Sequence, residues 1–158
     1  MNPNVLRWGM NLWPPYLGAG IRVRRIAPDY GEVVVEMKLG LSNRNYFGTH
    51  FGGSLYSMTD PFYALMLTNR LGPKYLVWDH SGSIEYLTPG RGLARAHFVL
   101  DEARVETIRA EAAGGEKTLP GFEVMVKDRA GHSIARVQKT VYVRLKKRYR
   151  PAQPAEAS

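Results

Sequence analysis

Cysteine is absent from this sequence of 158 residues. A chain without thiols forms no disulfide, has no thiolate nucleophile and holds no metal through thiolate ligands. Long apolar runs are absent too, since none approaches the roughly 20 residues needed to cross a bilayer. Arg7 and the pair Pro14-Pro15 also stand where a secretory leader would be apolar. We therefore expect a cytoplasmic protein with no membrane span, and no motif calls for a cofactor or a metal.

The composition has no bias typical of disorder, collagen or coiled coil. Hydrophobic residues make up 44% of the chain and charged residues 23%, which is ordinary for a globular protein. A chain of this length buries about two-thirds of its unfolded surface in one core. We expect a single domain over residues 1–145. Residues 146–158 are basic, contain proline and have little to bury, which predicts a disordered tail.

Acidic residues are too few to balance the basic ones. Lys and Arg total 22 against 14 Asp and Glu, a formal charge of +8, and such a surface attracts polyanions in general. The excess gathers at Arg22, Arg24 and Arg25 and in residues 144–150. No nucleic-acid motif accompanies it, and the aromatic residues are not interleaved with the basic runs as a stacking platform requires. We predict no binding to nucleic acid.

The first part of the chain predicts a helix followed by a hairpin. Between residues 6 and 17, apolar residues precede Pro14-Pro15. This pattern indicates a short amphipathic helix that the prolines end, with its aromatic face on the core. Residues 21–24 and 32–39 alternate at the strand period on either side of a turn, which predicts two paired strands.

The remainder predicts one long helix and several strands. Apolar residues recur at helical spacing over about residues 53–70, and Gly72-Pro73 ends this helix. Residues 101–113 are charged and rich in alanine, and they fit either a strand continuation or a helical turn. Strands are predicted at residues 75–87, 92–100, 122–127 and 133–144. The order predicts an α+β fold in which the long helix covers the concave face of an antiparallel sheet, with the other face or an edge free for self-association.

The candidate site lies where an irregular, Gly-rich loop enters the long helix. Gly52 and Gly53 stand at the helix N-terminus, where unpaired N–H groups can hold a carbonyl oxygen or a developing oxyanion. Asn45 and His50 can hydrogen-bond a substrate or an attacking water. Asp60 supplies a carboxylate that can act as a base or as a nucleophile.

The same residues have simpler interpretations. Gly52-Gly53 can be a turn into the helix, His50 a surface or capping residue, and Asn45 a turn residue. Asp60 followed by proline is also a good N-cap for a second helical segment. The apolar stripe passes this proline without losing phase, which favours one continuous or kinked helix. Proline inside a helix costs about 3 kcal/mol, so the kink needs a reason, such as reshaping a pocket.

Two stretches carry a resemblance to a known family. The run from Asn45 to Asp60 contains Gly-Thr-His-Phe-Gly-Gly and has a carboxylate seven residues after the second glycine. It resembles the loop and central helix of hotdog-fold acyl-CoA thioesterases of the phenylacetyl-CoA thioesterase type. The run from Trp78 to Gly90 resembles sequences in a bacterial branch of that superfamily, which is classified as a domain of unknown function. The similarity spans about residues 15–144.

The resemblance implies a hotdog fold, in which an antiparallel sheet wraps a long central helix. It also implies an acyl-CoA-type ligand and a homodimer with a continuous sheet, or a dimer of such dimers. The active sites would lie at the interface, with the carboxylate coming from the partner protomer. Catalytic roles fall on Asn45, His50 and Asp60, and substrate-binding roles on Thr49, Phe51, Gly52 and Gly53.

Helix geometry agrees with a site shared between protomers. Seven residues at about 1.5 Å of rise place Asp60 roughly 10 Å beyond Gly53, too far for one protomer to supply both groups. One position departs from the family pattern, which commonly reads His-Gly-Gly. Here Phe51 stands before Gly52, and His50 comes one residue earlier. Phe51 can line an acyl tunnel instead.

Two functions remain open after this comparison. One is a hydrolase in which Asp60 activates water and the Gly53 N–H stabilises the oxyanion; the other is a non-catalytic acyl-binding or scaffold dimer, which Phe51 favours. A hotdog hydratase would show an Asp and His pair with an Asn-Pro between them, and the chain has no such run. Basic residues that could bind CoA phosphates, although each also fits a solvated sheet edge, are Lys74, Arg91, Arg95 and Arg136.

Overall fold

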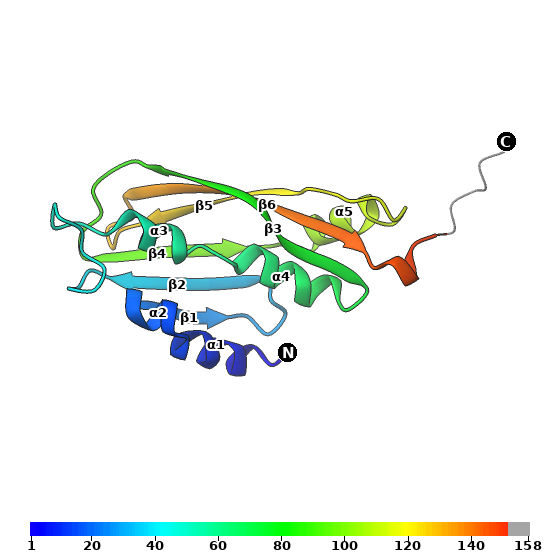
Figure 1. Cartoon of the computed structure of the whole chain (residues 1–158), viewed down its shortest axis with the longest axis horizontal. Helices are drawn as coiled ribbons and strands as arrows, with labels where there is room; N and C mark the ends of the chain where they lie inside the picture. The colour runs from blue at the N-terminus through cyan, green and yellow to red at the C-terminus, as the bar shows by residue number, and fades with distance from the viewer. Residues whose placement is uncertain (152–158) are drawn as a thin grey trace.

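The protein consists of one antiparallel sheet and the helices that pack against it (Figure 1). The computed structural model describes residues 1–151. The strands are β1 (Ile21–Ile26), β2 (Glu32–Lys38), β3 (Tyr75–Tyr86), β4 (Leu93–Val99), β5 (Gly121–Lys127) and β6 (Ser133–Leu145). Their order in the sheet is β1-β2-β4-β5-β6-β3. The helices are α1 (Pro3–Leu12), α2 (Pro14–Ala19), α3 (Gly52–Ser57), α4 (Phe62–Leu71) and α5 (Glu102–Glu111), with a 3-10 turn at Lys147–Tyr149.

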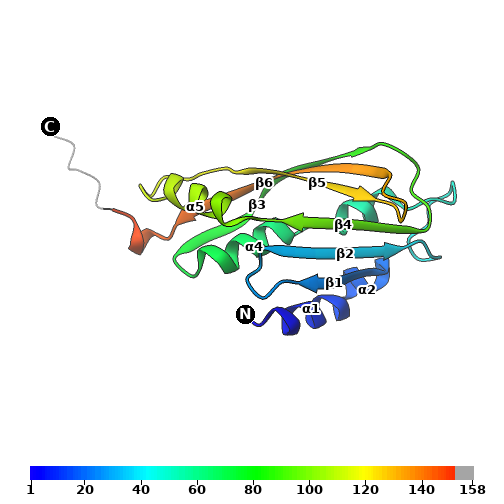
Figure 2. The ribbon, with the colours of Figure 1, turned by 180° about the vertical axis from the view of Figure 1, so that it is seen from behind.

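The predicted long helix is present but interrupted. It forms α3 and α4, which lie against one face of the sheet, and Figure 2 shows β2 and β4 in front of α4. The break falls at residues 58–61 and contains a cis peptide between Asp60 and Pro61. No side chain caps α4, so the capping interpretation of Asp60 is wrong. Phe62 is fully buried, and its ring centroid lies 4.9 Å from that of Phe98 on β4, which ties the helix to the middle of the sheet.

The N-terminal segment differs from the prediction. Pro14 and Pro15 begin α2 rather than only ending α1, because the fixed backbone angle of proline suits the first helical turn. The tryptophans lie largely outside the core: Trp8 is 61% exposed, and Trp13 is 49% exposed and packs against the ring of Tyr16, with the centroids 5.4 Å apart. Met10 and Tyr16 fill that place instead.

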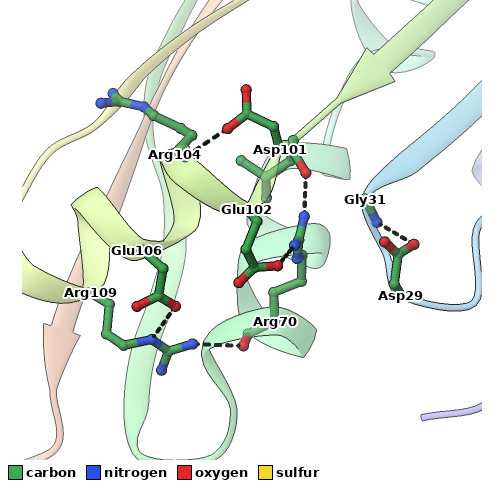
Figure 3. A network of polar contacts seen from close by, with 9 residues as sticks. Asp29, Gly31, Arg70, Asp101, Glu102, Arg104, Glu106 and Arg109 are labelled. Carbon is green, nitrogen blue, oxygen red and sulfur yellow. Dashed lines mark hydrogen bonds and ion pairs between the residues drawn. The ribbon is translucent and has the colours of Figure 1, made fainter.

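Residues 101–113, which fitted either a strand or a helical turn, contain α5. The carboxylate of Asp101 caps it by accepting a hydrogen bond of 2.7 Å from the backbone N–H of Arg104. Two arginines bind α5 to α4 (Figure 3). Arg70 donates to the Glu102 carboxylate, and Arg109 donates to the carbonyl of Arg70 over 3.2 Å. Beside these charged contacts, Val105, Ile108 and Ala112 bury one narrow apolar face of the helix in the core.

The two edges of the sheet differ in how they are covered. On β1, the side chain of Asn11 from α1 binds both the N–H and the carbonyl of Val23, at 2.7 and 3.0 Å. At the other edge, β3 has 12 residues and pairs only with β6 within the described chain. After β6, residues 147–149 form a 3-10 turn where the sequence predicted the start of a disordered tail; residues 152–158 of that predicted tail lie outside the described residues.

Candidate active site

A pocket of about 720 Å³ opens where the loop before α3 meets the connection from β3 to β4. The loop and the first turns of α3 supply one wall, and residues 86–91 supply the other. The lining residues are Asn45, Phe47, Thr49, His50, Phe51, Gly52, Gly53, Leu55, Tyr86, Leu87, Thr88, Pro89, Gly90 and Arg91. Six of the seven predicted site residues are therefore together, and the seventh, Asp60, is not among them.

The side chain of Asn45 holds the loop in shape. Its oxygen accepts hydrogen bonds from the N–H of Phe47 and of Thr49, at 3.0 and 3.1 Å. Its amide nitrogen donates to the Thr49 hydroxyl at 2.9 Å and to the carbonyl of His50 at 3.2 Å. Both ends of the amide are thus used inside the protein, as expected for an Asx-type turn residue. Asn45 positions the pocket wall and is already saturated with partners.

Gly52 and Gly53 leave space for two aromatic rings. A β-carbon on Gly52 would lie 2.6 Å from the hydroxyl oxygen of Tyr86, and one on Gly53 would lie 2.5 Å from Cε1 of Phe51. Any larger residue would displace these rings. Phe51 is 55% exposed and packs over the start of α3, so its ring borders the pocket beside the N–H groups of the first helical turn.

His50 has a buried ring nitrogen with no hydrogen-bond partner among the described residues. The residue is only 3% exposed, and Nε2 lies 3.2 Å from the carbonyl oxygen of Gly92. An Nε2–H that donates to this carbonyl leaves Nδ1 as an acceptor, and Nδ1 has no partner in the described part of the chain. Burial lowers the pKa of His50, against the opposing effect of the hydrogen bond to Gly92. The imidazole is therefore neutral at neutral pH.

Asp60 belongs to a separate charged cluster. Its carboxylate lies 2.5 Å from Nζ of Lys139 on β6, and that nitrogen lies 3.4 Å from Oδ1 of Asp79 on β3. The Lys139 side chain is 2% exposed, whereas those of Asp60 and Asp79 are 50% and 24% exposed. Lys139 Nζ also lies 5.2 Å from the ring centroid of Tyr56. One buried cation thus joins two carboxylates, and the half-exposed Asp60 presents the cluster to solvent.

Lys139 and the partly buried Asp79 have shifted pKa values. Burial alone would lower the pKa of Lys139, but the hydrogen bond to Asp60 and the charges of Asp79 and Asp60 outweigh it and raise that pKa. Burial raises the pKa of Asp79, and the attraction of Lys139 only partly opposes this. Lys139 is therefore a permanent cation at neutral pH, and it holds Asp60 through a charge-assisted hydrogen bond.

Sequence reasoning assigned no site role to Lys139 or Asp79, and of the wall at residues 86–91 it named only Arg91. A signal for Lys139 was present, because it occupies the inward-facing phase of β6 between Val137 and Val141. A charge in that phase of a buried strand implies a buried partner. Its partners could not be named, since Asp79 lies on another strand and Asp60 lies in the break between α3 and α4.

Residues 1–151 contain neither a cluster of metal ligands nor a membrane-spanning helix. No group of three His, Asp or Glu side chains there is arranged to hold a metal ion. No helix in that range is long and apolar enough to cross a membrane.

Comparison with solved structures identifies the architecture. A Pseudomonas aeruginosa protein of unknown function, whose description refers to a thioesterase, matches at a TM-score of 0.79 and 19% identity over 90% of this chain and 95% of that one. A Haemophilus influenzae thioesterase matches at a TM-score of 0.67 and 12% identity over 92% of each chain. A mutant of the phenylacetic acid degradation protein PaaI from Thermus thermophilus matches at a TM-score of 0.56 and 26% identity over 84% of this chain and 99% of that one.

These similarities confirm the predicted α+β hotdog fold, with a central helix, a curled antiparallel sheet and N-terminal helices. They also confirm the resemblance to hotdog-fold thioesterases. A search of curated proteins found no match. A family model described as a domain of unknown function, DUF4442, matches residues 3–143, and the chain therefore belongs to that family.

Proposed function

We propose that this protein hydrolyses an acyl-CoA-type thioester at a site shared by two protomers of a homodimer. The observation that carries the proposal is the pocket of about 720 Å³ at the start of the central helix. Its size is in the range of small-molecule sites, and apolar side chains such as Phe47, Leu55 and Leu87 can surround an acyl group. The fold is one that thioesterases use.

The open edge of β3 supports the homodimer. A strand of 12 residues without proline or lysine offers a row of backbone groups to another chain. Asp60 lies outside the pocket of its own protomer. Pairing of two β3 edges would bring a second copy of the charged cluster alongside the pocket. The site then consists of two half-sites, the loop of one protomer and Asp60 of the other.

The proposed chemistry is water attack on the thioester carbonyl. The carbonyl oxygen accepts hydrogen bonds from N–H groups at Gly53, which stabilise the negative charge that develops there. The Asp60 carboxylate, which accepts a hydrogen bond from Lys139, takes a proton from water while the water oxygen attacks the carbonyl carbon. The carbon–sulfur bond then breaks and the departing sulfur takes the proton, which yields a carboxylic acid and a free thiol.

Arg91 is the best candidate for the phosphate groups of CoA. It lines the pocket and lies exposed at its rim, where its guanidinium donates to the carbonyl of Gly48 over 3.2 Å. Arg95 and Arg136 are instead paired with glutamates, and Lys74 lies 5.7 Å from the ring of Tyr149.

A non-catalytic acyl-binding dimer is the second candidate. Two observations favour it: the amide of Asn45 is fully used within the loop, and Lys139 already occupies one oxygen of Asp60. Both reduce the number of groups free to act on a substrate, while leaving the apolar pocket intact.

Thiol release from short, aromatic and long acyl-CoAs separates the two candidates. We expect Asp60→Asn to lower the rate by about 100-fold or more, as typical for loss of a general base. Asp79→Asn, which also touches Lys139 but is more buried, should keep most of the rate. Equal rates in wild type and Asp60→Asn would exclude the Asp60 mechanism. Binding of acyl-CoA without thiol release by the wild type would favour the second candidate.

Subunit complementation tests the shared site. Asp60→Asn and Gly53→Val damage different half-sites, so a mixture of the two inactive proteins forms heterodimers that contain one intact site. We expect the mixture to regain measurable activity. Each variant alone serves as the control, and a mixture as inactive as its components would place both groups in one protomer.

A further inference from the structure

Helix α1 turns an apolar face to solvent. Val5, Trp8 and Leu12 follow the spacing of one helical face and are 66%, 61% and 68% exposed. Trp13 and Leu17 of the following segment extend this face, and each is 49% exposed. We call these five residues the N-terminal patch. The opposite side of α1, which includes the buried Met10, already supplies the contacts with the core.

Helices α1 and α2 are attached to the fold mainly by residues outside the N-terminal patch. Asn11 attaches α1 to the edge of β1 through hydrogen bonds to Val23. The ring of Tyr16 packs under α4 with its centroid 6.3 Å from that of Phe62. Of the patch residues, Trp13 takes part in these attachments, since its ring centroid lies 5.4 Å from that of Tyr16. Two of the chain's three tryptophans nevertheless lie on the patch, and contiguous exposed apolar surface of this kind marks an interaction site.

The border of the patch is basic. Residues 1–28 contain four arginines and no aspartate or glutamate. The Arg7 guanidinium lies 5.3 Å from the ring centroid of Trp8, and Arg22 donates to the carbonyl of Asn11 on α1 over 3.2 Å. Unlike Arg24 and Arg25, which pair with glutamates, these two arginines have no acidic partner among residues 1–151. A tryptophan-rich apolar face with arginine at its margin is the pattern of a helix that lies in a membrane interface.

We propose that α1 and α2 bind the surface of a membrane containing anionic lipids, with the N-terminal patch inserted among the headgroups. Charge favours a lipid over a second copy of this chain, because two such patches would bring Arg7 and Arg22 of one copy against those of the other. The position of the N-terminal patch is also compatible with membrane binding. Helix α1, which carries most of the patch, borders β1, at the opposite end of the sheet from β3 (Figure 1), so membrane contact and pairing at β3 do not compete. This inference does not depend on hydrolysis of a thioester.

Vesicle flotation of the full chain tests the proposal. We expect binding to vesicles of equimolar phosphatidylcholine and phosphatidylglycerol, with a blue shift of tryptophan fluorescence, and little binding to phosphatidylcholine alone. Trp8→Ser with Leu12→Ser should weaken binding by tenfold or more, since both side chains lose their apolar insertion. Arg7→Gln with Arg22→Gln should also weaken it by about tenfold or more, through loss of attraction to anionic headgroups.

Val99→Ser with Leu119→Ser is the matched control. These residues are 58% and 40% exposed away from the patch, and their replacement should leave binding unchanged. Circular dichroism and thermal unfolding check that every variant is folded. Absence of wild-type binding, or full binding by the Trp8 and Leu12 variant, would overturn the proposal. If the wild type does not bind vesicles and the Trp8 and Leu12 variant forms a smaller oligomer, the patch contacts a second copy of the chain. That result would also overturn the membrane proposal.

Discussion

Replacement of Lys139 by methionine is expected to destabilise the fold by about 3 kcal/mol near neutral pH. Methionine nearly matches the apolar length of lysine but removes the cation that lies 2.5 Å from Asp60 and 3.4 Å from Asp79. Breaking a buried ion pair by removing one partner costs about 3–5 kcal/mol, because the other charge stays buried and unpaired. We expect the lower end of this range, since Asp60 and Asp79 are 50% and 24% exposed and water screens them.

The loss should depend on pH through Asp79. Burial raises the pKa of Asp79 above its ordinary value of 3.8, so the folded state binds its proton more tightly than the unfolded chain does. Burying the ionised Asp79 carboxylate therefore costs no folding free energy at pH values below 3.8, where the carboxyl is protonated in both states. The cost is complete at pH values above the raised pKa of the folded state. Removing Lys139 increases this cost. The pKa of Lys139 itself is raised from 10.5, so its stabilising effect is lost only at strongly basic pH.

Urea unfolding at a series of pH values measures the effect. The midpoint difference between wild type and Lys139→Met should be largest near neutral pH and should shrink as the pH falls through the raised pKa of Asp79. Adding Asp79→Asn to the variant should recover part of the stability. Lys127→Met, on the exposed face of β5, is the control and should change stability by about 0.5 kcal/mol or less. A loss that is the same at acidic and neutral pH, and that Asp79→Asn does not relieve, would refute the charge argument.

Three further variants test the pocket. Arg91→Gln should raise KM for acyl-CoA by about fivefold or more with little change in kcat, since a phosphate contact is made equally in ground and transition states; an equal effect on a thioester without the nucleotide would contradict this role. Asn45→Ala should destabilise the protein by about 2 kcal/mol in urea unfolding, because the loop loses several hydrogen bonds, and an unchanged midpoint would show that the loop holds its shape without them. The pKa of His50 is lowered from 6.5 by burial, so the wild type should lose stability as the pH falls through that value, and His50→Asn should lose less; parallel curves for the two proteins would show that His50 does not titrate in this way.

Local patterns were sufficient for most of the secondary structure. Strand alternation, the Gly72-Pro73 stop and the irregular loop before the central helix each depend on neighbours in the sequence, so the strands, the helix end and the site loop could be predicted. The resemblance around Asn45 to Asp60 then pointed to the hotdog fold. The helix α5 was not distinguished from a strand, because its apolar face is narrow, with Val105, Ile108 and Ala112 set among charged residues and other alanines.

By itself, the sequence determined the six strands, the long helix that covers their sheet, and the glycine-rich loop at the start of that helix. Only the tertiary structure decided which side chains meet. Lys139 reaches Asp60 and Asp79 because β6 pairs with β3 beneath the break in the central helix, and the wall at residues 86–91 reaches the loop through the sheet's register. Such encounters depend on strand order and pairing over long separations, which local periodicity does not encode. The same holds for α1, whose amphipathic pattern was clear but whose tryptophan face turned out to point away from the core.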